Sequence, residues 1–369
     1  MPNYLVVATS GRAIAQGLKS LGCSVAAADG FADVDTSVAT TELKKVKRSH
    51  FGLDHDEVLQ VVDALQSKTS FDGLFFDAAM ESNPSLLDEI NVDPVFGNSS
   101  QVLSACKNPK VFFSILDQHS IPYPDVRFEF ETRLISNDAW LVKDAQSTGG
   151  VGVAPANGEI DSCRNIYFQK KINGLNFSLT FLANGKAILE LGFNTLWSEK
   201  LGDCVPYAYA GAINQVKLDK EIKDNALRYA KVIAKEFQLI GLNSIDFICT
   251  GKSVYVLEVN PRIPATYELY ETKFGELMSQ HIEVCKSRIL PAVKGQQLLR
   301  AHAIVYAPTD INVSESISWP LWTADRPHAK EVIKKFEPVC SIFAGGQNSA
   351  QVYEMIKTRK QSILAKFAQ

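Results

Sequence analysis

The stretch SIDFICTGKSVYVLEVNPR, residues 244–262, has the alternating apolar pattern of two short β-strands joined by a tight turn. Within these strands stand Asp246, Glu258 and Asn260. Asp and Asn are among the poorest strand formers, and a hairpin that only packed a core would not carry them. We therefore expect these three residues to have a second role.

The two faces of this hairpin are predicted to differ, because side chains alternate along a strand. With residues 251–253 as a three-residue loop, Asp246 lies directly opposite Glu258, with their side chains roughly 5 Å apart. Asn260 points the same way as Glu258, at roughly 7 Å along the strand. The opposite face is entirely apolar and is expected to pack against the core through Ile245, Phe247, Cys249, Tyr255, Leu257 and Val259.

The facing carboxylates indicate a metal site. Two such groups repel each other and are destabilising unless a cation lies between them. Two carboxylates and an amide oxygen suit Mg²⁺ (or Mn²⁺), which completes its coordination with water and phosphate oxygens. The alternative is a solvent-exposed polar face, but Ile248, Val254 and Val256 are predicted on the same face and argue against full exposure.

A phosphate-binding loop is predicted after the strand AWLVKDA, residues 139–145. Lys143 stands near the end of this strand, and the loop STGGVGV, residues 147–153, follows it. Glycines at positions 149, 150 and 152 allow the backbone to approach a phosphate closely. Many glycine-rich loops are merely mobile, but a lysine just before the loop would serve the same ligand.

Three further cations are candidates for contact with an anion. Lys107 and Lys110 lie near the start of a helix predicted over residues 104–120, where lysines are usually solvated. Arg262 follows Glu258 and Asn260 on one segment, where it is placed to brace a transferring phosphate or a substrate carboxylate.

The first hundred residues predict a doubly wound parallel sheet. Strands are expected at residues 4–8, 24–28 and 71–76, with a helix between the first two, so ligands would bind at the carboxyl edge of the sheet. The first turn reads S-G-R-A-I-A, residues 10–15, and lacks the G-x-G-x-x-G pattern of dinucleotide binders. Asp29, at the end of the second strand, is more simply a cap or turn residue than a ribose ligand.

Together these features resemble the ATP-grasp superfamily over roughly residues 100–290. The resemblance rests on the helix followed by IPYP, the strand with Lys143 and its glycine loop, Q-x-x-I-x-G at 169–174, and LEVNPRIPAT at 257–266. It implies an α/β and α+β chain with a Rossmann-like domain at 1–100 and an ATP-grasp domain at 101–295. The lid lobe would span about 110–172, and a small C-terminal α+β region at 296–369 would complete the grasp.

The resemblance implies that ATP lies between two α+β lobes, with the glycine loop as a lid. Phosphate contacts would come from Lys143 and Lys110, with Lys107 as the alternative to Lys110. Two positions depart from the family pattern, because Lys170 replaces an acidic residue and Asn176 replaces a ribose-binding carboxylate; both leave the purine and ribose contacts open. The nucleotide-binding set would be Lys110, Lys143, Ser147, Thr148, Gly149, Gly150, Gln169, Lys170, Lys171, Ile172 and Asn176.

Most members of the family join a carboxylate to an amine through an acyl phosphate, and the resemblance implies this reaction here. Lys143 and the metal would neutralise the γ-phosphate, and Arg262 would stabilise the oxyanion that forms when the amine attacks. Alternatives are a purine-pathway ligase, a D-alanine-type ligase, a carboxylase, or a non-catalytic nucleotide-binding module.

The local patterns EVNPRIPATY (258–267), WTADRP (322–327) and PVCSIFA (338–344) resemble tyramine–glutamate ligases of methanofuran-type coenzyme synthesis. On that resemblance glutamate is the expected acyl donor. Asp77 and Glu81 are candidates for holding an ammonium group, with helix capping and turn formation as the alternative explanation. The full set of expected substrate contacts is Ser10, Gly11, Asp77, Glu81, Arg262, Thr266 and Tyr267.

Composition sets the remaining expectations. The chain has 369 residues, which suggests two or three domains, and its net charge of −3 does not favour a nucleic-acid surface. Seven scattered cysteines without a C-x-x-C pair favour a reducing cytoplasm. No signal peptide and no apolar run of membrane-spanning length is expected. The expected partners are small-molecule carboxylates and amines, with a homodimer left open.

Overall fold

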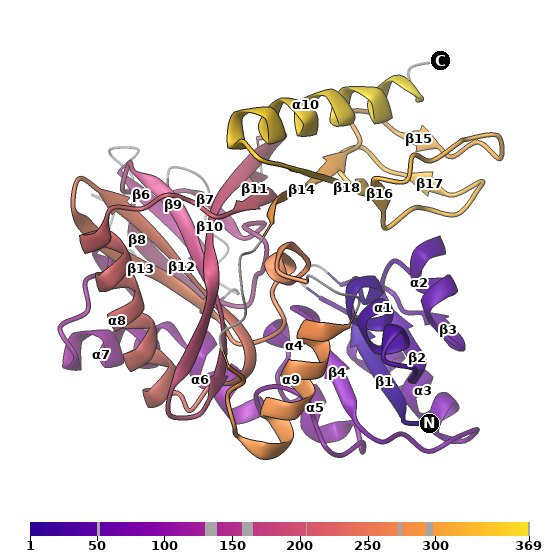
Figure 1. Ribbon diagram of the computed structural model, residues 1–369, viewed down its shortest axis with the longest axis horizontal. Coiled ribbons are helices and arrows are strands. Elements are labelled where there is room, and N and C mark those ends of the chain that lie inside the picture. The colour runs from indigo at the N-terminus through magenta and orange to yellow at the C-terminus, as the bar shows by residue number, and fades with distance from the viewer. Residues whose placement is uncertain are drawn as a thin grey trace.

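The computed structural model describes residues 1–49, 52–129, 139–156, 165–203, 205–271, 275–292 and 298–367. The described strands form four sheets, and Figure 1 shows the indigo N-terminal unit on one side and the larger magenta and orange lobe on the other. The yellow C-terminal helix lies across one end of the molecule.

The N-terminal unit is a parallel sheet in the order β3-β2-β1-β4, which confirms the predicted arrangement. β1 and β2 are buried almost throughout, as expected of parallel strands covered on both faces. Asp33 caps α2 and Asp54 caps α3 by accepting backbone N–H groups. The elements are β1 (Asn3–Ala8), α1 (Arg12–Ser20), β2 (Ser24–Asp29), α2 (Val34–Ala39), β3 (Glu42–Lys45), α3 (His55–Gln66), β4 (Leu74–Phe76), α4 (Ala79–Ser82) and α5 (Leu86–Glu89).

The single helix predicted over residues 104–120 is wrong, because the structure has two helices here. They are α6 (Ser100–Lys107) and α7 (Pro109–Gln118). Asn108 ends the first and caps the second, accepting from the N–H groups of Lys110 and Val111. Pro109 has no N–H to donate, so it breaks the first helix and starts the second. The break separates Lys107 and Lys110 onto different helices.

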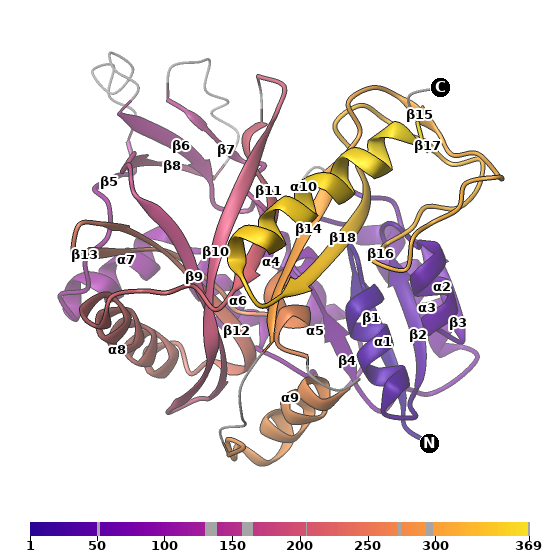
Figure 2. The same cartoon turned by 45° about the horizontal axis from the view of Figure 1, so that its top comes forward.

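A small antiparallel sheet in the order β5-β8-β6-β7 lies in the region predicted to be the lid lobe, and it is called the lid sheet below. Its strands are β5 (Val126–Arg127), β6 (Trp140–Asp144), β7 (Val153–Pro155) and β8 (Ile166–Lys170). In Figure 2 this sheet lies at the upper left, beside the upper part of β10 and apart from the N-terminal unit at the right.

The large sheet has eight strands in the described part of the chain, in the order β13-β12-β9-β10-β11-β14-β18-β16. One apolar core lies between this sheet and helices α7 and α8. The elements are β9 (Leu175–Asn184), β10 (Ile188–Leu201), β11 (Val205–Asn214), α8 (Lys220–Glu236), β12 (Ile240–Thr250) and β13 (Ser253–Asn260).

The C-terminal strands β14, β18 and β16 extend the same sheet, so this region is continuous with the grasp lobe. The helix α10 packs on β14 and β18 through an apolar stripe that includes Val352, Ile356 and Ile363. The last elements are η2 (Ala265–Leu269), α9 (Glu276–Ser287), β14 (Leu299–Tyr306), β15 (Ile311–Asn312), β16 (Thr323–Ala324), β17 (Val332–Ile333), β18 (Pro338–Gly346) and α10 (Ser349–Ala365).

A second core joins the N-terminal unit to the grasp lobe. Ile14 and Leu18 of α1 pack with Tyr267, Leu277 and Met278 from η2 and α9. This packing brings the carboxyl edge of the N-terminal sheet towards the end of β13. None of the helices in the described ranges is long and apolar enough to cross a membrane.

Candidate active site between the hairpin and the lid

The hairpin β12–β13 places Asp246 opposite Glu258 and Ser244 opposite Asn260, as the sequence predicts. The three-residue loop that was predicted to give this register is wrong. Thr250 pairs with Ser253, so the turn contains two residues rather than three, with Gly251 at φ +56°. A β-bulge between Asp246 and Phe247 then adds one residue to β13 and restores the pairing.

The bulge also changes which residues of β13 face the core. Val254, Val256 and Val259 are buried in the core, whereas Tyr255 and Leu257 are only partly buried and lie outside it. The prediction that Tyr255 and Leu257 pack in the core is therefore wrong. An extra residue in one strand reverses the alternation on either side of it, which the regular period of two does not predict.

Asp246 and Glu258 have opposite pKa shifts. Burial and the neighbouring Glu258 raise the pKa of Asp246 to about 8. Burial also disfavours the charged form of Glu258, but Lys143, Lys107 and the hydrogen bond with Asp246 outweigh it and lower the pKa of Glu258. Without a cation, the pair therefore shares one proton near neutral pH, held on Asp246.

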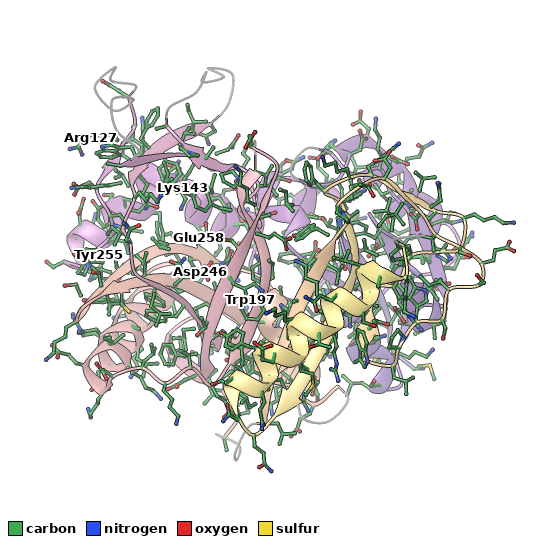
Figure 3. All side chains as sticks on the ribbon, turned by 90° about the horizontal axis from the view of Figure 1, so that it is seen from above. Arg127, Lys143, Trp197, Asp246, Tyr255 and Glu258 are labelled. Atoms are coloured by element: carbon green, nitrogen blue, oxygen red, sulfur yellow. The ribbon has the colours of Figure 1, made fainter. Side chains whose placement is uncertain are left out.

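Lys143 reaches this pair from the lid sheet, and Figure 3 places it in the same part of the molecule as Glu258 and Asp246. Its Nζ donates to Oε1 of Gln169 at 3.0 Å. Burial favours the neutral amine, but Tyr167 and Glu258 outweigh it and raise the pKa of Lys143. Lys143 therefore remains a cation inside the cleft.

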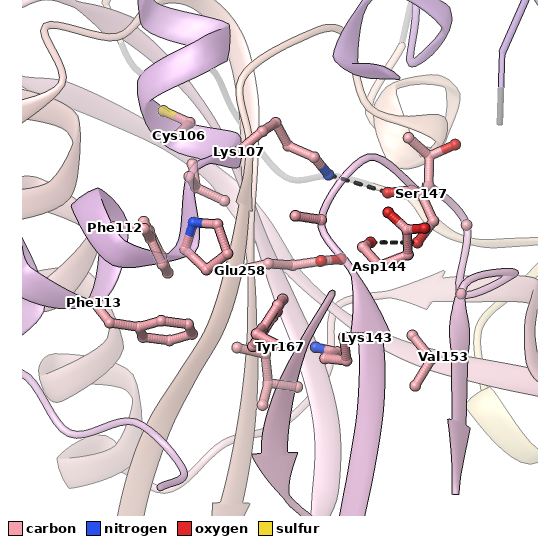
Figure 4. Close-up of a pocket in the computed structure, with 17 residues that line it drawn as sticks. Cys106, Lys107, Phe112, Phe113, Lys143, Asp144, Ser147, Val153, Tyr167 and Glu258 are labelled. Atoms are coloured by element: carbon pink, nitrogen blue, oxygen red, sulfur yellow. Dashed lines mark hydrogen bonds between the residues drawn. The ribbon is translucent and has the colours of Figure 1, made fainter. Parts of the chain in front are cut away.

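Lys107, at the end of α6, is the second cation of the cleft, and its side chain is partly buried. Its Nζ donates to the carbonyl oxygen of Ser147 at 3.2 Å and lies 3.5 Å from Oε2 of Glu81. Burial opposes its charge, but Glu81 and Glu258 raise its pKa. Figure 4 shows the hydrogen bond from Lys107 to Ser147 across the mouth of the cleft.

The cleft between these groups contains about 610 Å³ of empty space and is open to solvent. Lys107, Lys143 and Glu258 line it together with the glycine loop (Figure 4). Its remaining lining includes Ser147, Thr148, Gly149, Gly150, Cys106, Phe112, Phe113, Leu257 and Tyr167. It therefore combines two cations, a carboxylate, a glycine-rich backbone and aromatic rings, the mixture of apolar surface and a few polar groups that small-molecule pockets have.

The glycine loop is docked against β11. The N–H of Tyr209 donates to the carbonyl oxygen of Gly149 at 2.8 Å. Gly150 has φ +74°, and a Cβ at this position would lie 2.0 Å from the carbonyl oxygen of Tyr207. Glycine is required at position 150 because the loop backbone touches the backbone of β11.

Several predicted nucleotide contacts lie outside this cleft. Lys110 is exposed, with its Nζ 5.7 Å from the ring centre of Phe128, so Lys107 lines the cleft and Lys110 does not. Gln169 is buried beside Lys143, and its Nε2 has no hydrogen-bond partner among the described residues. The other four residues are not among the lining side chains: Lys170, Lys171, Ile172 and Asn176.

Asp77 and Gly11 have structural partners at the carboxyl edge of the N-terminal sheet. The Asp77 carboxylate accepts from the N–H groups of Thr9, Ser10 and Ala79, so it has the turn-capping contacts that the sequence left as an alternative. The N–H of Gly11 donates to Asp29 Oδ2 at 2.6 Å. Asp29 thus stabilises the first turn, as a turn residue rather than a free ligand.

Three more of the predicted substrate contacts are also engaged internally. The hydroxyl of Ser10 lies 3.4 Å from Asp325. Thr266 is buried and hydrogen-bonded to Thr180 at 2.7 Å. Tyr267 is buried and donates to Glu271 at 3.3 Å. The Ser10 and Thr266 contacts link segments distant in the sequence, whereas the Tyr267 contact is local.

Arg262 and Glu81 lie together beside Asn260, one of the predicted metal ligands. Arg262 donates from Nη2 to Asn260 Oδ1 at 3.1 Å, and its Nε lies 3.4 Å from Glu81 Oε1. Asn260 in turn donates from Nδ2 to Asp246 Oδ2 at 3.3 Å. To act as a cation ligand beside Asp246, the Asn260 amide would therefore have to turn its oxygen round.

Two features were not anticipated from the sequence: Tyr167 at the cleft, and the ion pairs of Arg12, which does not line the cleft. Tyr167 lines the cleft, and its position opposite Lys143 in the β6–β8 register explains why. Strand alternation could have identified it, since it lies two residues before Gln169. Arg12 is bound by Glu268 and Asp325, at 2.5 and 2.7 Å; no local pattern indicates partners so distant in the sequence.

Comparison with known proteins agrees with this architecture. Residues 106–266 match the ATP-grasp domain family model. The carbamoyl phosphate synthase large chain of Lachnoclostridium phytofermentans is 27% identical over 194 residues, covering 47% of this chain and 18% of that protein. The chain thus spans less than a fifth of the length of this relative.

Solved structures extend the likeness to almost the whole chain. Biotin carboxylase from Campylobacter jejuni superposes with a TM-score of 0.73 at 11% identity, covering 99% of this chain and 95% of the other. The L-amino acid ligase from Bacillus licheniformis superposes with a TM-score of 0.71 at 14% identity, covering 98% and 97%. The chain therefore has the ATP-grasp fold, and its residues 106–266 match the ATP-grasp domain model.

Proposed function

We propose that this protein joins a carboxylate to an amine with ATP and Mg²⁺, through an acyl phosphate. The observation that carries the proposal is the placement of Asp246 opposite Glu258 at a cleft lined by Lys107 and Lys143. Of the two opposed carboxylates, Glu258 lines the cleft with the two lysines and Asp246 pairs with Glu258, an arrangement suited to a divalent cation and to the phosphates of a nucleotide.

The donor set fits Mg²⁺. Within the described ranges no cluster of three or more His, Cys, Asp or Glu side chains could hold a metal, so the candidate ligands are two carboxylates and the Asn260 amide. Asp246 keeps a proton at neutral pH because burial and the facing Glu258 raise its pKa, and a cation would replace that proton. Such an oxygen set with few protein ligands is typical of Mg²⁺ that also binds phosphates.

Different residues of the chain would have different roles in phosphoryl transfer. Lys143 and Lys107 would hold the phosphates, since both remain protonated in the cleft. A bound Mg²⁺ would neutralise further phosphate charge. Arg262, next to Asn260, would stabilise the negative oxygen that forms when the amine attacks the acyl phosphate. The loop at 147–150 would exclude water that would otherwise hydrolyse this species.

An amino acid, with glutamate first, is the acyl donor that we propose. Support comes from the pattern EVNPRIPATY at 258–267 and from the L-amino acid ligase among the structures of the same fold. A role in methanofuran-type coenzyme synthesis is the more specific form of this proposal.

A carboxylase is the second candidate. It is favoured by the similarity to biotin carboxylase and to the N5-carboxyaminoimidazole ribonucleotide synthetase from Thermotoga maritima, which has a TM-score of 0.67. Bicarbonate would then take the place of the amino-acid carboxylate in the attack on the γ-phosphate.

The direct test is release of ADP and phosphate by purified protein with ATP and Mg²⁺. One series contains glutamate or another amino acid with a panel of amines, including tyramine, and the other contains bicarbonate. Dependence on an amino acid and an amine, with the ligated product seen by mass spectrometry, supports the ligase. Dependence on bicarbonate supports the carboxylase, and no turnover in either series contradicts both.

The Glu258→Gln variant tests the metal assignment. It retains the shape of the side chain but removes the charge, so we expect ADP release to fall at least about a hundredfold. The matched control is Glu221→Gln, which alters an exposed carboxylate paired with Lys252 at the turn of the hairpin. Unchanged ADP release in Glu258→Gln would show that the metal is not bound here.

A further inference from the structure

Glu81 is a fully buried carboxylate that the N-terminal unit contributes to the site. It lies on α4, and its side chain is 0% exposed. Its two oxygens lie 3.5 Å from Lys107 Nζ and 3.4 Å from Arg262 Nε. A carboxylate without water must be compensated by charge, and these two cations of the candidate active site supply that compensation.

These contacts contradict the sequence-based prediction that Glu81 holds a substrate ammonium group. The side chain has no surface for a ligand to reach, and two cations already neutralise its charge. A third cation would meet net repulsion. Glu81 therefore acts on the protein's own cations rather than on substrate.

The geometry at Arg262 indicates what Glu81 does. Among the described residues, Arg262 Nε and Glu81 Oε1 have no hydrogen-bond partner although both are buried. Their 3.4 Å separation exceeds the roughly 2.7–2.9 Å of a charge-assisted hydrogen bond. The attraction is therefore mainly electrostatic, and it holds the guanidinium near Glu81 without a hydrogen bond between Nε and Oε1.

The other contacts of Arg262 are less able to hold its guanidinium in place during the proposed reaction. One is to Asn260 Oδ1 at 3.1 Å, and this oxygen is also a candidate cation ligand. Another is to the carbonyl oxygen of Ile263 at 3.5 Å. Glu81 is the one carboxylate within ion-pair distance of Arg262 in the described ranges that is not itself a candidate metal ligand.

We propose that Glu81 is a positioning residue, which holds Arg262 at the reaction centre from the N-terminal unit. Without Glu81, the carboxylates that remain electrostatically coupled to Arg262 include Asp77, Asp246 and Glu258, and the last two are the proposed cation ligands. Lys107 would be affected less, because it keeps its bond to Ser147. This inference rests on the proposed ligase function.

The test compares Glu81→Gln with wild-type protein in steady-state kinetics. We expect kcat to fall at least about tenfold while KM for MgATP changes less than about threefold, since an interaction made at the transition state is lost and nucleotide binding is retained. Glu81→Asp, which keeps the charge but has a shorter reach, should recover part of kcat. The control is Asp35→Asn, which removes a buried carboxylate of the same unit, paired with Arg326. This control should leave the ratio of kcat to KM unchanged for the folded fraction.

A double variant shows whether Glu81 acts through Arg262. If it does, Glu81→Gln should lower kcat by less than about twofold when Arg262 is already Lys, because the two effects are not additive. Two results overturn the inference and leave the ligase function standing. One is that Glu81→Gln lowers kcat as much in the Arg262→Lys background as in wild type. The other is that Glu81→Gln raises KM and leaves kcat unchanged. A wild-type protein without turnover overturns both.

Discussion

At the residue scale, Asp246 shows how the site depends on its neighbours. The sequence places it opposite Glu258, and burial with that neighbour raises its pKa to about 8. A raised pKa in the folded state means that protonation favours folding. Its contribution to stability is present at low pH and is lost as the pH rises through about 8.

The Asp246→Asn variant tests both the repulsion and the metal. The amide can still hydrogen-bond to Glu258 but cannot repel it. In EDTA we therefore expect the variant to be at least as stable as wild type at pH 8.5 and to lose less stability between pH 6 and pH 8.5. MgADP at about a hundredfold its dissociation constant should stabilise wild type by about 2.7 kcal/mol and the variant far less.

Thermal and urea unfolding in EDTA and in MgADP measure these effects. Asp224→Asn, an exposed helix carboxylate beside Lys220, is the control and should behave as wild type. Equal stabilisation of wild type and Asp246→Asn by MgADP would exclude Asp246 from the metal site.

At the scale of elements, the β-bulge and the glycine loop determine the shape of the cleft. The bulge at Asp246 and Phe247 turns Leu257 out of the core and into the lining. The loop reaches β11 closely enough that Tyr209 donates to Gly149. Both features are local irregularities in otherwise regular strands and turns.

Substituting each of the two loop glycines distinguishes the effect of losing contact with β11 from the effect of backbone strain. Gly149 and Gly150 both have positive φ, but a Cβ would meet Tyr207 only at position 150. Each alanine pays roughly 1–2 kcal/mol for the left-handed conformation, whereas Gly150→Ala also prevents docking on β11. We expect Gly150→Ala to lower kcat at least about tenfold more than Gly149→Ala, with similar melting temperatures.

Activity and thermal unfolding of the two variants provide the measurement. Equal losses in both variants would mean that contact with β11 is irrelevant to turnover and that only backbone strain matters.

At the scale of the whole molecule, buried polar side chains join the N-terminal unit to the rest. Arg12 of α1 binds Glu268 of η2 and Asp325, which follows β16. His281 of α9 accepts from the N–H of Leu242 and lies 3.2 Å from the carbonyl oxygen of Phe96. These contacts hold the parts that meet at the cleft.

His281 makes this junction sensitive to acid. Burial lowers its pKa to about 4, from 6.5. The unfolded chain therefore takes up a proton below pH 6.5 that the folded protein resists, and stability is lost as the pH falls from 6.5 towards 4. At pH 5 this amounts to about 2 kcal/mol, at about 1.36 kcal/mol per pH unit.

Urea unfolding at pH 7 and pH 5 tests this effect. We expect His281→Gln to be less stable than wild type at pH 7 but to lose about 2 kcal/mol less on acidification. The control His55→Gln changes an exposed histidine and should retain most of the wild-type loss. An equal loss in wild type and His281→Gln would show that His281 is not the acid-sensitive group.

The sequence by itself determined the elements whose residues repeat with a regular period. The parallel N-terminal strands, the hairpin and the pairing of Asp246 with Glu258 follow from apolar alternation and from carboxylates that a strand would not otherwise carry. The ATP-grasp order of motifs is likewise visible in the linear chain.

Only the tertiary structure decided which cations reach the cleft and what Glu81 contacts. The Asn108–Pro109 break directs Lys107 inward and leaves Lys110 exposed. Glu81 meets Arg262, and Arg12 meets Asp325, across stretches of chain that share no local pattern. Contacts between distant residues depend on how separate units pack, and a periodicity read over a few residues carries no information about that packing.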